Sequence, residues 1–576
     1  MDNLHLAVSS SKRINVLLAG VAILSGLIII KLVSLQIFKY GQFAALAQSQ
    51  QSRKWQIAPK RGTIYAYNKN ELVPLAMNQK LFLCYADPKF IENKIETAEK
   101  LSGLLGVSAN ELKKKFEATG DYVILKQKLP EELADKIKEA NLKGIGLQDQ
   151  PNRVYPEGEL ASQLLGFVNA EGKGQYGIEG QFNNYLTGSP GQLKAKTDVN
   201  GVPVATADNT LTAPKNGQSY VLTLDRNVQA VAEKYLKEAV ESNQAASGTV
   251  VIMNSKTGGI IAMASFPTYD PNNFGAVKDY RQFQNLAISD EYEPGSGFKV
   301  ITMSAGLDSK KVKPDTLFTD PGVVKVSDRE IFNAKQEKHG TQTMSDVIQK
   351  SINTGVVFVL MQLGDKTDTI TLAGKKLLYN YIKKFGFGVA TGIELPGEAP
   401  GRIRQASTYD VNYANMTFGQ GLTATTLQMV TAFNAVANRG KLIQPYIVDK
   451  VTQDGRDRTT SPRVLRRVVS SEAAEQIGNM MTLVVEKGSG WPARRKGYRI
   501  AGKTGTAQVP RADGQGYEVG KNIGSFVGFA PFENPKFTMG VRIDYPKTAG
   551  FAEETAVPVF GKIADFLYAY YAIPPN

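Results

Sequence analysis

The sequence predicts an α+β protein with a single N-terminal transmembrane helix, an α+β module, and a larger domain in which helices flank an antiparallel sheet. Three observations indicate this class. The run from Ile14 to Phe38 is long and apolar, short strand-like and helical runs follow it to about residue 215, and paired strand signals come after that point. With 42% hydrophobic and 21% charged residues, the 576-residue chain has the composition of an ordinary globular protein.

The net charge of +14 is spread along the chain, and no motif typical of nucleic-acid recognition accompanies it. We therefore expect no nucleic-acid partner, because an anionic lipid surface or anionic polymer explains the charge equally well. Cys84 is the single cysteine and cannot form an internal disulfide. His5 and His339 are too few for a histidine-based metal site or proton relay. We expect neither metal nor cofactor, so any catalysis must use other side chains.

The apolar run at residues 14–38 predicts a membrane anchor. As one helix it would extend about 37 Å, which is enough to cross a bilayer with some tilt. A cleaved signal peptide is the alternative, because Ala45-Leu46-Ala47 resembles a cleavage site. That site lies far beyond an apolar core that already exceeds the usual length of about 7 to 15 residues, which favours retention.

Basic residues lie on both flanks of this run: Lys12 and Arg13 precede it, and Lys31 and Lys39 lie at its other end. The first pair favours a cytoplasmic tail at residues 1–13, whereas the second pair weakens that assignment. We expect a single-pass protein of the cytoplasmic membrane, with its N-terminus inside and the rest of the chain outside.

Residues 39–215 predict a modest α+β module. Leu81–Tyr85 is strand-like, two stretches are helical (Ala98–Leu105 and Pro130–Ala140), and Ser108 with Glu111 has the spacing of a helix capping box. A series of turn signals then ends at Pro214-Lys-Asn-Gly217. We place a domain boundary there, between residues 39–215 and 216–576.

The second domain begins with a strand-like alternation at Ser219–Leu224 and a helical run at Val228–Leu236. A β-hairpin follows, with strands at Thr249–Met253 and Ile260–Ala264 around a glycine-containing turn. Further strands are predicted near the C-terminus, at Tyr498–Ala501, Gly524–Ala530 and Phe537–Ile543, before a helix at Phe560–Tyr571. This pattern indicates an antiparallel sheet covered by helices.

Ser296-Gly-Phe-Lys299 supplies a serine and a lysine that can share one helix face. A lysine that is held partly neutral can activate a serine without histidine or cysteine. Glu293-Pro-Gly295 marks a turn into this helix, so Ser296 would lie at the positive N-terminus, where the helix dipole and any neighbouring cation lower the pKa of Lys299.

The S-x-x-K spacing is weak evidence alone, since Ser9 to Lys12 repeats it in the basic flank of the membrane run. Two later motifs strengthen it. Ser351-Ile-Asn353 offers a hydroxyl and an amide, and Lys503-Thr-Gly505 lies in a strand context. This order is the signature of penicillin-recognising serine acyl transferases. Two decoys, Lys256-Thr-Gly258 and Ser108-Ala-Asn110, both precede Ser296 and lie in a turn and a helix cap.

Each of these residues also has an ordinary structural explanation. Ser296 could be a helix cap, Ser351 and Asn353 polar loop residues, and Lys503 a charge that protects a strand edge. Independent accidents rarely fall in a required order, so we favour the catalytic interpretation.

With these motifs, the chain resembles a class B penicillin-binding protein over nearly its whole length. Other stretches that carry the resemblance are Arg61-Gly-Thr-Ile64, Arg153-Val-Tyr-Pro156, Gly174–Glu179, Pro267–Asn272 and Phe418–Leu422. The resemblance implies an elongated α+β pedestal of the dimerisation type at residues 39–215 and a penicillin-binding transpeptidase domain at residues 216–576. It also implies a serine D,D-transpeptidase that cross-links peptidoglycan stem peptides and is inhibited by β-lactams.

Within the resemblance, Ser296 would attack the penultimate D-Ala carbonyl, Lys299 would take its proton, and Ser351 would pass protons. Asn353 would bind the donor amide. The donor carboxylate would lie against the strand residues Lys503, Thr504, Gly505 and Thr506, and the oxyanion would be held by the backbone amides of Ser296 and Thr506. Two departures from the family pattern are Gly297 after the nucleophile and Ala66-Tyr67 in the pedestal.

The segment Gly166-Phe-Val168 resembles division transpeptidases more than elongation ones. The implied partners are membrane lipid, lipid-linked glycan, other division proteins and a SEDS-family glycan polymerase. Rival interpretations are an elongation-type transpeptidase, a β-lactamase or β-lactam sensor, a non-catalytic division scaffold of the same fold, and a basic DNA-binding protein. The intact Ser296, Lys299, Ser351 and Lys503 argue against the scaffold, and the short N-terminal tail argues against the sensor.

Overall fold

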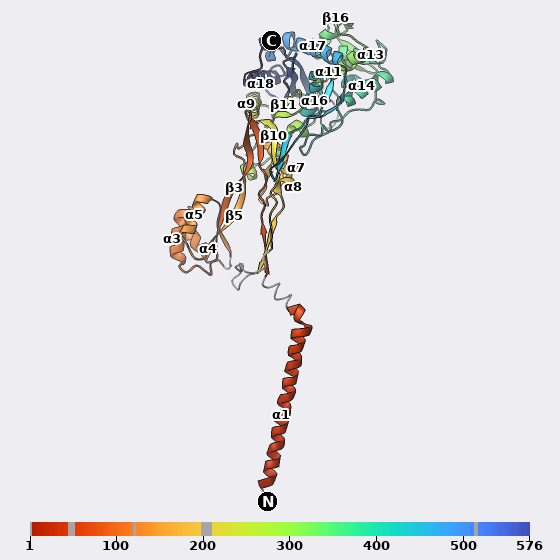
Figure 1. The fold of residues 1–576 in the computed structure, drawn as a ribbon. Coiled ribbons are helices and arrows are strands. Elements are labelled where there is room, and N and C mark those ends of the chain that lie inside the picture. The colour runs from red at the N-terminus through yellow and green to blue at the C-terminus, as the bar shows by residue number, and fades with distance from the viewer. Residues whose placement is uncertain (1–2, 44–51, 119–121, 197–209, 512–515, 576) are drawn as a thin grey trace. The chain divides into compact units, whose positions relative to one another are not determined.

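The computed structural model describes residues 3–43, 52–118, 122–196, 210–511 and 516–575 (Figure 1). Two compact units are present. The first contains residues up to Lys60 together with Gly188–Asn216, and the second contains Arg61–Thr187 together with Gly217–Asn576. The second unit contains residues from both sides of residue 215. The predicted domain boundary at that residue therefore stays a prediction.

The first unit contains the N-terminal helix α1 (Asn3–Val33), which continues as a π-helical turn at Ser34–Phe38. The most apolar 18-residue window of the helical stretch Lys12–Phe38 has a mean hydropathy of 2.7, and the stretch is long and apolar enough to cross a membrane. Its most apolar window is not buried in the protein. A small antiparallel sheet completes this unit, with order β1 (Ser52–Ile57), β8 (Gly191–Lys196) and β9 (Thr210–Thr212).

A mixed sheet in the second unit joins chain segments that are far apart in sequence. Its strand order is β19-β18-β10-β2-β3-β4, and β5 also pairs with β3. The strands are β2 (Ile64–Asn68), β3 (Glu71–Ala86), β4 (Val123–Pro130), β5 (Ile145–Val154), β10 (Ser219–Asp225), β18 (Val448–Gln453) and β19 (Arg456–Thr459). Strand β2 pairs parallel with β10, which begins about 150 residues later. This pairing fixes the N-terminal segment to the larger part of the unit.

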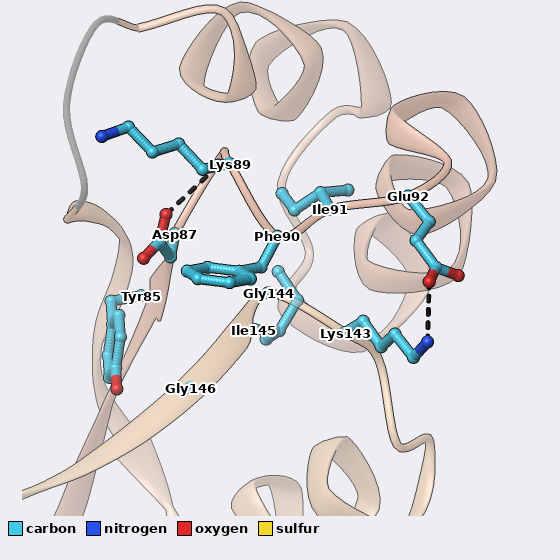
Figure 2. A pocket seen from close by; sticks show the side chains of 10 residues that line it. All are labelled: Tyr85, Asp87, Lys89, Phe90, Ile91, Glu92, Lys143, Gly144, Ile145 and Gly146. Atoms are coloured by element: carbon cyan, nitrogen blue, oxygen red, sulfur yellow. Dashed lines mark hydrogen bonds and ion pairs between the residues drawn. The ribbon is translucent and has the colours of Figure 1, made fainter. Parts of the chain in front are cut away.

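The C-terminal half of β3 packs with three helices around a small hydrophobic core that is separate from the two larger ones. These are α3 (Lys94–Leu105), α4 (Ala109–Phe116) and α5 (Glu131–Glu139), close to the predicted helices, and the core includes Phe82, Leu101 and Cys84. Ser108 Oγ accepts the amide of Glu111 at 3.2 Å, as predicted. An open pocket of about 660 Å³ lies in this region. In Figure 2, exposed Phe90 lies between Tyr85 and the Lys143–Glu92 ion pair.

The central sheet of the larger part is antiparallel throughout, with order β12-β11-β23-β22-β21. Its strands are β11 (Ser247–Asn254), β12 (Ile260–Phe266), β21 (Ala501–Pro510), β22 (Tyr517–Ala530) and β23 (Phe537–Asp544). The predicted hairpin and the two last strands are confirmed. The strand predicted at Tyr498 begins only at Ala501, because the Tyr498 ring stacks on Tyr568 at 3.8 Å and its hydroxyl donates to Ile573 O.

Alternating side chains of this sheet enter two separate cores. Val250 and Ile252 face α9 (Arg226–Ser242) and α18 (Ala556–Tyr570), whereas Val251 and Met253 face the other layer. The helices of that layer are α11 (Lys299–Asp308), α12 (Met344–Gln349), α13 (Asn353–Leu363), α14 (Leu372–Lys384), α15 (Asp410–Met416), α16 (Thr426–Ala437) and α17 (Ser471–Lys487), with α16 directly on the sheet. Both faces are therefore covered, as the predicted fold class requires.

A buried ion cluster joins three of the N-terminal stretches that the sequence singled out. Glu179, in α7 (Gly177–Gln181), is fully buried and accepts from Arg153 Nε at 2.6 Å and from Arg61 Nε at 2.8 Å. Arg153 also donates to Gly62 O at 2.8 Å. One carboxylate thus ties the start of the unit to β5 and to α7.

Replacing Glu179 with glutamine leaves two buried guanidinium groups without their counter-charge. We expect Glu179→Gln to lower the free energy of unfolding by about 3 kcal/mol, measured by denaturant titration in detergent. The matched control is Glu171→Gln, because its ion pair with Lys173 is about two-thirds exposed and should contribute under about 1 kcal/mol. Equal losses in the two variants would contradict the importance of this cluster.

Candidate active site

Ser296 lies at the start of a helix, as predicted from the Glu293-Pro-Gly295 turn. A 3-10 turn at Gly295–Phe298 leads directly into α11, which begins at Lys299. Gly295 has φ +54, a left-handed conformation that favours glycine. A Cβ at this position would lie 2.9 Å from the carbonyl oxygen of Thr506. The turn that contains Ser296 can therefore approach strand β21 only because residue 295 has no side chain.

Strand β21 carries the Lys503-Thr-Gly505 motif and forms the edge of the central sheet. A Cβ on Gly505 would lie 2.6 Å from the carbonyl oxygen of Pro294 and from Ser525 Oγ. The backbone amides of Ser296 and Thr506 thus belong to two segments in close contact. An edge strand can also accept an extended peptide as an additional strand.

The two motif lysines meet at one hydroxyl. Lys299 Nζ donates to Ser351 Oγ at 3.1 Å and to its carbonyl oxygen at 2.5 Å, and Lys503 Nζ donates to Ser351 Oγ at 3.0 Å. Both lysines are fully buried, and within the described chain neither forms an ion pair with a carboxylate. The three motifs, up to 207 residues apart in the chain, are therefore assembled around Ser351.

Burial lowers the pKa of Lys299 well below the ordinary lysine value, and the nearby charge of Lys503 lowers it further. Burial alone lowers the pKa of Lys503 to about 7. Because both nitrogens bond the same oxygen, they lie within about 6 Å of one another, where two positive charges repel by about 3 kcal/mol. This arrangement favours a neutral amine at neutral pH.

The Lys299 amine is directed at Ser351 and not at the neighbouring Ser296. Among the residues that the structure describes, Ser296 Oγ has no hydrogen-bond partner, and it is only partly buried. The helix spacing suggested direct contact between Lys299 and Ser296. In the structure the carbonyl and hydroxyl of Ser351 hold the amine, so Ser351 is the residue that connects the three motifs.

Ser351 itself has an unusual backbone conformation, with φ +58. Non-glycine residues rarely occupy this region, and such strain clusters at functional sites. The conformation lies between the end of α12 and the start of α13, and it turns the Ser351 side chain toward the two lysines. Asn353 follows as the first residue of α13, and its side-chain amide donates to the carbonyl oxygen of Phe332 at 2.8 Å.

Several contacts around the site were not predicted from the motifs. Thr504 Oγ1 lies 2.7 Å from Ser489 Oγ, and Ala552 N donates to Thr506 Oγ1 at 3.4 Å. Glu293, just before the turn that contains Ser296, accepts from the amide of Gly421 at 2.8 Å. The stretch Phe418–Leu422, which carried part of the resemblance, therefore braces this turn. In the described part of the chain, no group of acidic, histidine or cysteine side chains could hold a metal ion.

Several known proteins are similar to this chain in sequence and in fold. Residues 248–565 match the penicillin binding protein transpeptidase domain, and residues 56–222 match the penicillin-binding protein dimerisation domain. The chain is 34% identical to Stage V sporulation protein D of Bacillus subtilis, over 91% of this chain and 80% of that protein. It is 30% identical to the peptidoglycan D,D-transpeptidase FtsI of Buchnera aphidicola, over 95% of this chain and 93% of that protein.

Among solved structures, penicillin binding protein 3 of Mycobacterium tuberculosis complexed with aztreonam has a TM-score of 0.70 at 25% identity. That match covers 91% of this chain and 98% of that one. The family matches, the curated relatives and the fold agree with the motif order in the sequence. The chain therefore belongs to the class B penicillin-binding proteins.

Proposed function

We propose that this protein is a serine D,D-transpeptidase that cross-links peptidoglycan stem peptides through an acyl-enzyme on Ser296. The observation that carries the proposal is the position of Ser351 Oγ, which lies 3.1 Å from Lys299 Nζ and 3.0 Å from Lys503 Nζ. Lys299 directly follows the turn that contains Ser296. The peptidoglycan D,D-transpeptidase of Buchnera, which is similar over nearly its whole length, supports the same activity.

In the first step, the neutral amine of Lys299 turns from Ser351 to Ser296 and takes its proton, and the serine oxygen attacks the penultimate D-Ala carbonyl. The resulting oxyanion lies against the backbone amides of Ser296 and Thr506. When the tetrahedral intermediate collapses, the peptide nitrogen leaves with a proton delivered through Ser351, and terminal D-Ala is released. The products of this step are D-Ala and an ester on Ser296.

The second step reverses this path with a different amine. The amino group of a second stem peptide attacks the ester carbonyl and loses its proton through Ser351. Lys299 returns a proton to the Ser296 oxygen as the new amide bond forms. Because Lys299 and Lys503 both contact Ser351, this hydroxyl can pass protons in either direction without a histidine.

The donor peptide would be held along the edge of the central sheet. Lys503, Thr504 and Thr506 face its carboxylate, and its backbone pairs with the outer edge of β21. Since the Asn353 amide nitrogen already donates to the Phe332 carbonyl, its side-chain oxygen remains to accept the donor peptide N–H. The relative from Mycobacterium was solved in complex with aztreonam, which supports β-lactams as ligands of this protein.

The proposed acyl-enzyme is tested by covalent labelling with a fluorescent penicillin, followed over time after free label is removed. We expect stable labelling of the wild type and its complete loss in Ser296→Ala. Ser309→Ala is the matched control and should label normally, because Ser309 Oγ donates to the backbone at the other end of α11. Labelling that survives in Ser296→Ala would refute the nucleophile, whereas rapid release of label would indicate a β-lactamase.

We also propose that the protein acts in septal wall synthesis, anchored by residues 14–38 with its N-terminus in the cytoplasm. The similarity to FtsI and the segment Gly166-Phe-Val168 support the division role. The expected substrate is glycan that remains linked to lipid, made by a SEDS-family polymerase that contacts the anchor and the pedestal. The similarity to a sporulation protein favours a spore-wall role as the second candidate.

In growing cells, a fluorescently tagged chain should gather at the division septum, and a penicillin that cannot cross the membrane should label it from outside. Both results follow if the catalytic domain lies outside the membrane at the site of division. Signal along the lateral wall would instead support an elongation role, and signal only in sporulating cells would support the second candidate. Failure of external labelling, with labelling intact in lysed cells, would contradict the orientation.

A further inference from the structure

Helix α13, which begins with Asn353, receives its cap from a different segment of the chain. The residue before it, Ile352, has an apolar side chain and cannot accept from the free amides of the first turn. Asn333 supplies the missing acceptor, because its Oδ1 accepts from Asn353 N at 3.0 Å and from Thr354 N at 3.1 Å. The S-x-N motif therefore depends on a residue about 20 positions upstream.

Asn333 is in turn held by Asp320, the last residue of β13 (Leu317–Asp320). Asn333 Nδ2 donates to both carboxylate oxygens of Asp320, at 2.8 and 3.0 Å. Thr354 Oγ1 donates to Asp320 at 2.6 Å, and the Gly322 amide donates at 3.0 Å. The backbone amide of His339 donates to Asp320 Oδ2 at 3.0 Å, and His339 Nδ1 lies 2.7 Å from the same oxygen.

The Asp320 side chain is completely buried and faces hydrogen-bond donors on both oxygens. Burial raises the pKa of this carboxyl, but hydrogen bonds from Thr354, Gly322, His339 and Asn333 outweigh that effect and lower the pKa to about 2. The carboxylate therefore stays charged at every pH at which the enzyme would work. Asparagine at position 320 would replace one of the two acceptor oxygens with an NH₂ group. In either orientation of the side chain, that group would face a hydrogen-bond donor.

The same segment also fixes the side chain of Asn353. Strand β15 (Arg329–Phe332) ends immediately before Asn333, and its last carbonyl accepts the Asn353 amide at 2.8 Å. Ser351, two residues before Asn353, has φ +58. Such a conformation persists only where surrounding contacts determine it. The cap thus determines where the helix, and with it both polar side chains of the motif, begins.

We propose that Asp320 is a positioning residue for acyl transfer, acting through Asn333 to set the backbone from which Ser351 and Asn353 project. The inference rests on the proposed transpeptidase function, since acylation of Ser296 is its readout. Asp320 does not touch the substrate; it orients the groups that do. The simpler alternative is that this cluster only stabilises the fold.

The test compares rates of acylation by a fluorescent penicillin, normalised to folded protein, in full-length wild type, Asp320→Asn and Asn333→Ala. The control is Asp225→Asn, because Asp225 is also a buried carboxylate that caps a helix, accepting from Asn227 N and Val228 N of α9. That helix carries none of the motif residues. The double variant Asp320→Asn/Asn333→Ala is measured in the same way, and unfolding temperatures are recorded for all five proteins.

We expect Asp320→Asn and Asn333→Ala each to slow acylation about 10-fold or more, as displacement of catalytic groups by a fraction of an ångström does. The double variant should be no slower than the worse single variant, because both changes break one path. Asp225→Asn should lose thermal stability while its folded molecules acylate at the wild-type rate.

Wild-type acylation rates in Asp320→Asn and Asn333→Ala would overturn the inference, even if both proteins melt at lower temperature. If Asp320→Asn does not fold, Asn333→Ala alone decides the question by the same criterion. Multiplying losses in the double variant would show that Asp320 does not act through Asn333. An unlabelled wild type would instead count against the proposed function itself.

Discussion

The arrangement of the candidate active site depends most on the placement of two buried lysine amines against one serine hydroxyl. Lys299 and Lys503 are both fully buried, and neither has a carboxylate partner in the described chain. A buried unpaired ammonium is strongly disfavoured, and a second one within about 6 Å adds repulsion. The folded protein can therefore accommodate the pair only if the two amines are not both protonated. This constraint makes a neutral base available at neutral pH without histidine.

Much of the surrounding architecture serves to bring these groups together. Helix α11 presents Lys299, the edge strand β21 presents Lys503, and the strained turn before α13 presents Ser351. Glycine at positions 295 and 505 allows the turn that contains Ser296 and strand β21 to approach without side chains between them. Away from the site, the buried Glu179 cluster and the parallel pairing of β2 with β10 join the N-terminal segment to this core.

Local pattern was sufficient to predict much of this protein. A glycine-containing turn between two apolar runs located the hairpin of β11 and β12. Motif order selected Lys299, Ser351 and Lys503, which hydrogen-bond one another in the structure. The strand at Tyr498 was placed too early, because contacts with Tyr568 and Ile573 outweigh its strand propensity.

What the sequence could not reveal involves residues that are distant along the chain. Nothing near Asp320 signals that it meets Asn333 and Thr354, and nothing near Lys299 signals that its amine bonds Ser351 and not Ser296. Such partners depend on how loops return to one another, which periodicity does not encode. The Ser108 cap was predictable for the opposite reason, since both of its partners lie within one turn.

The most direct test of this account is an NMR titration of the lysine side chains, with the two resonances assigned by their loss in Lys299→Met and Lys503→Met. The account predicts that both amines lose their protons well below the ordinary value of 10.5, with Lys503 near pH 7. Removing Lys503 should raise the pKa of Lys299, because a neighbouring positive charge is lost. Titration of both amines near 10.5 in the wild type would contradict a neutral buried base.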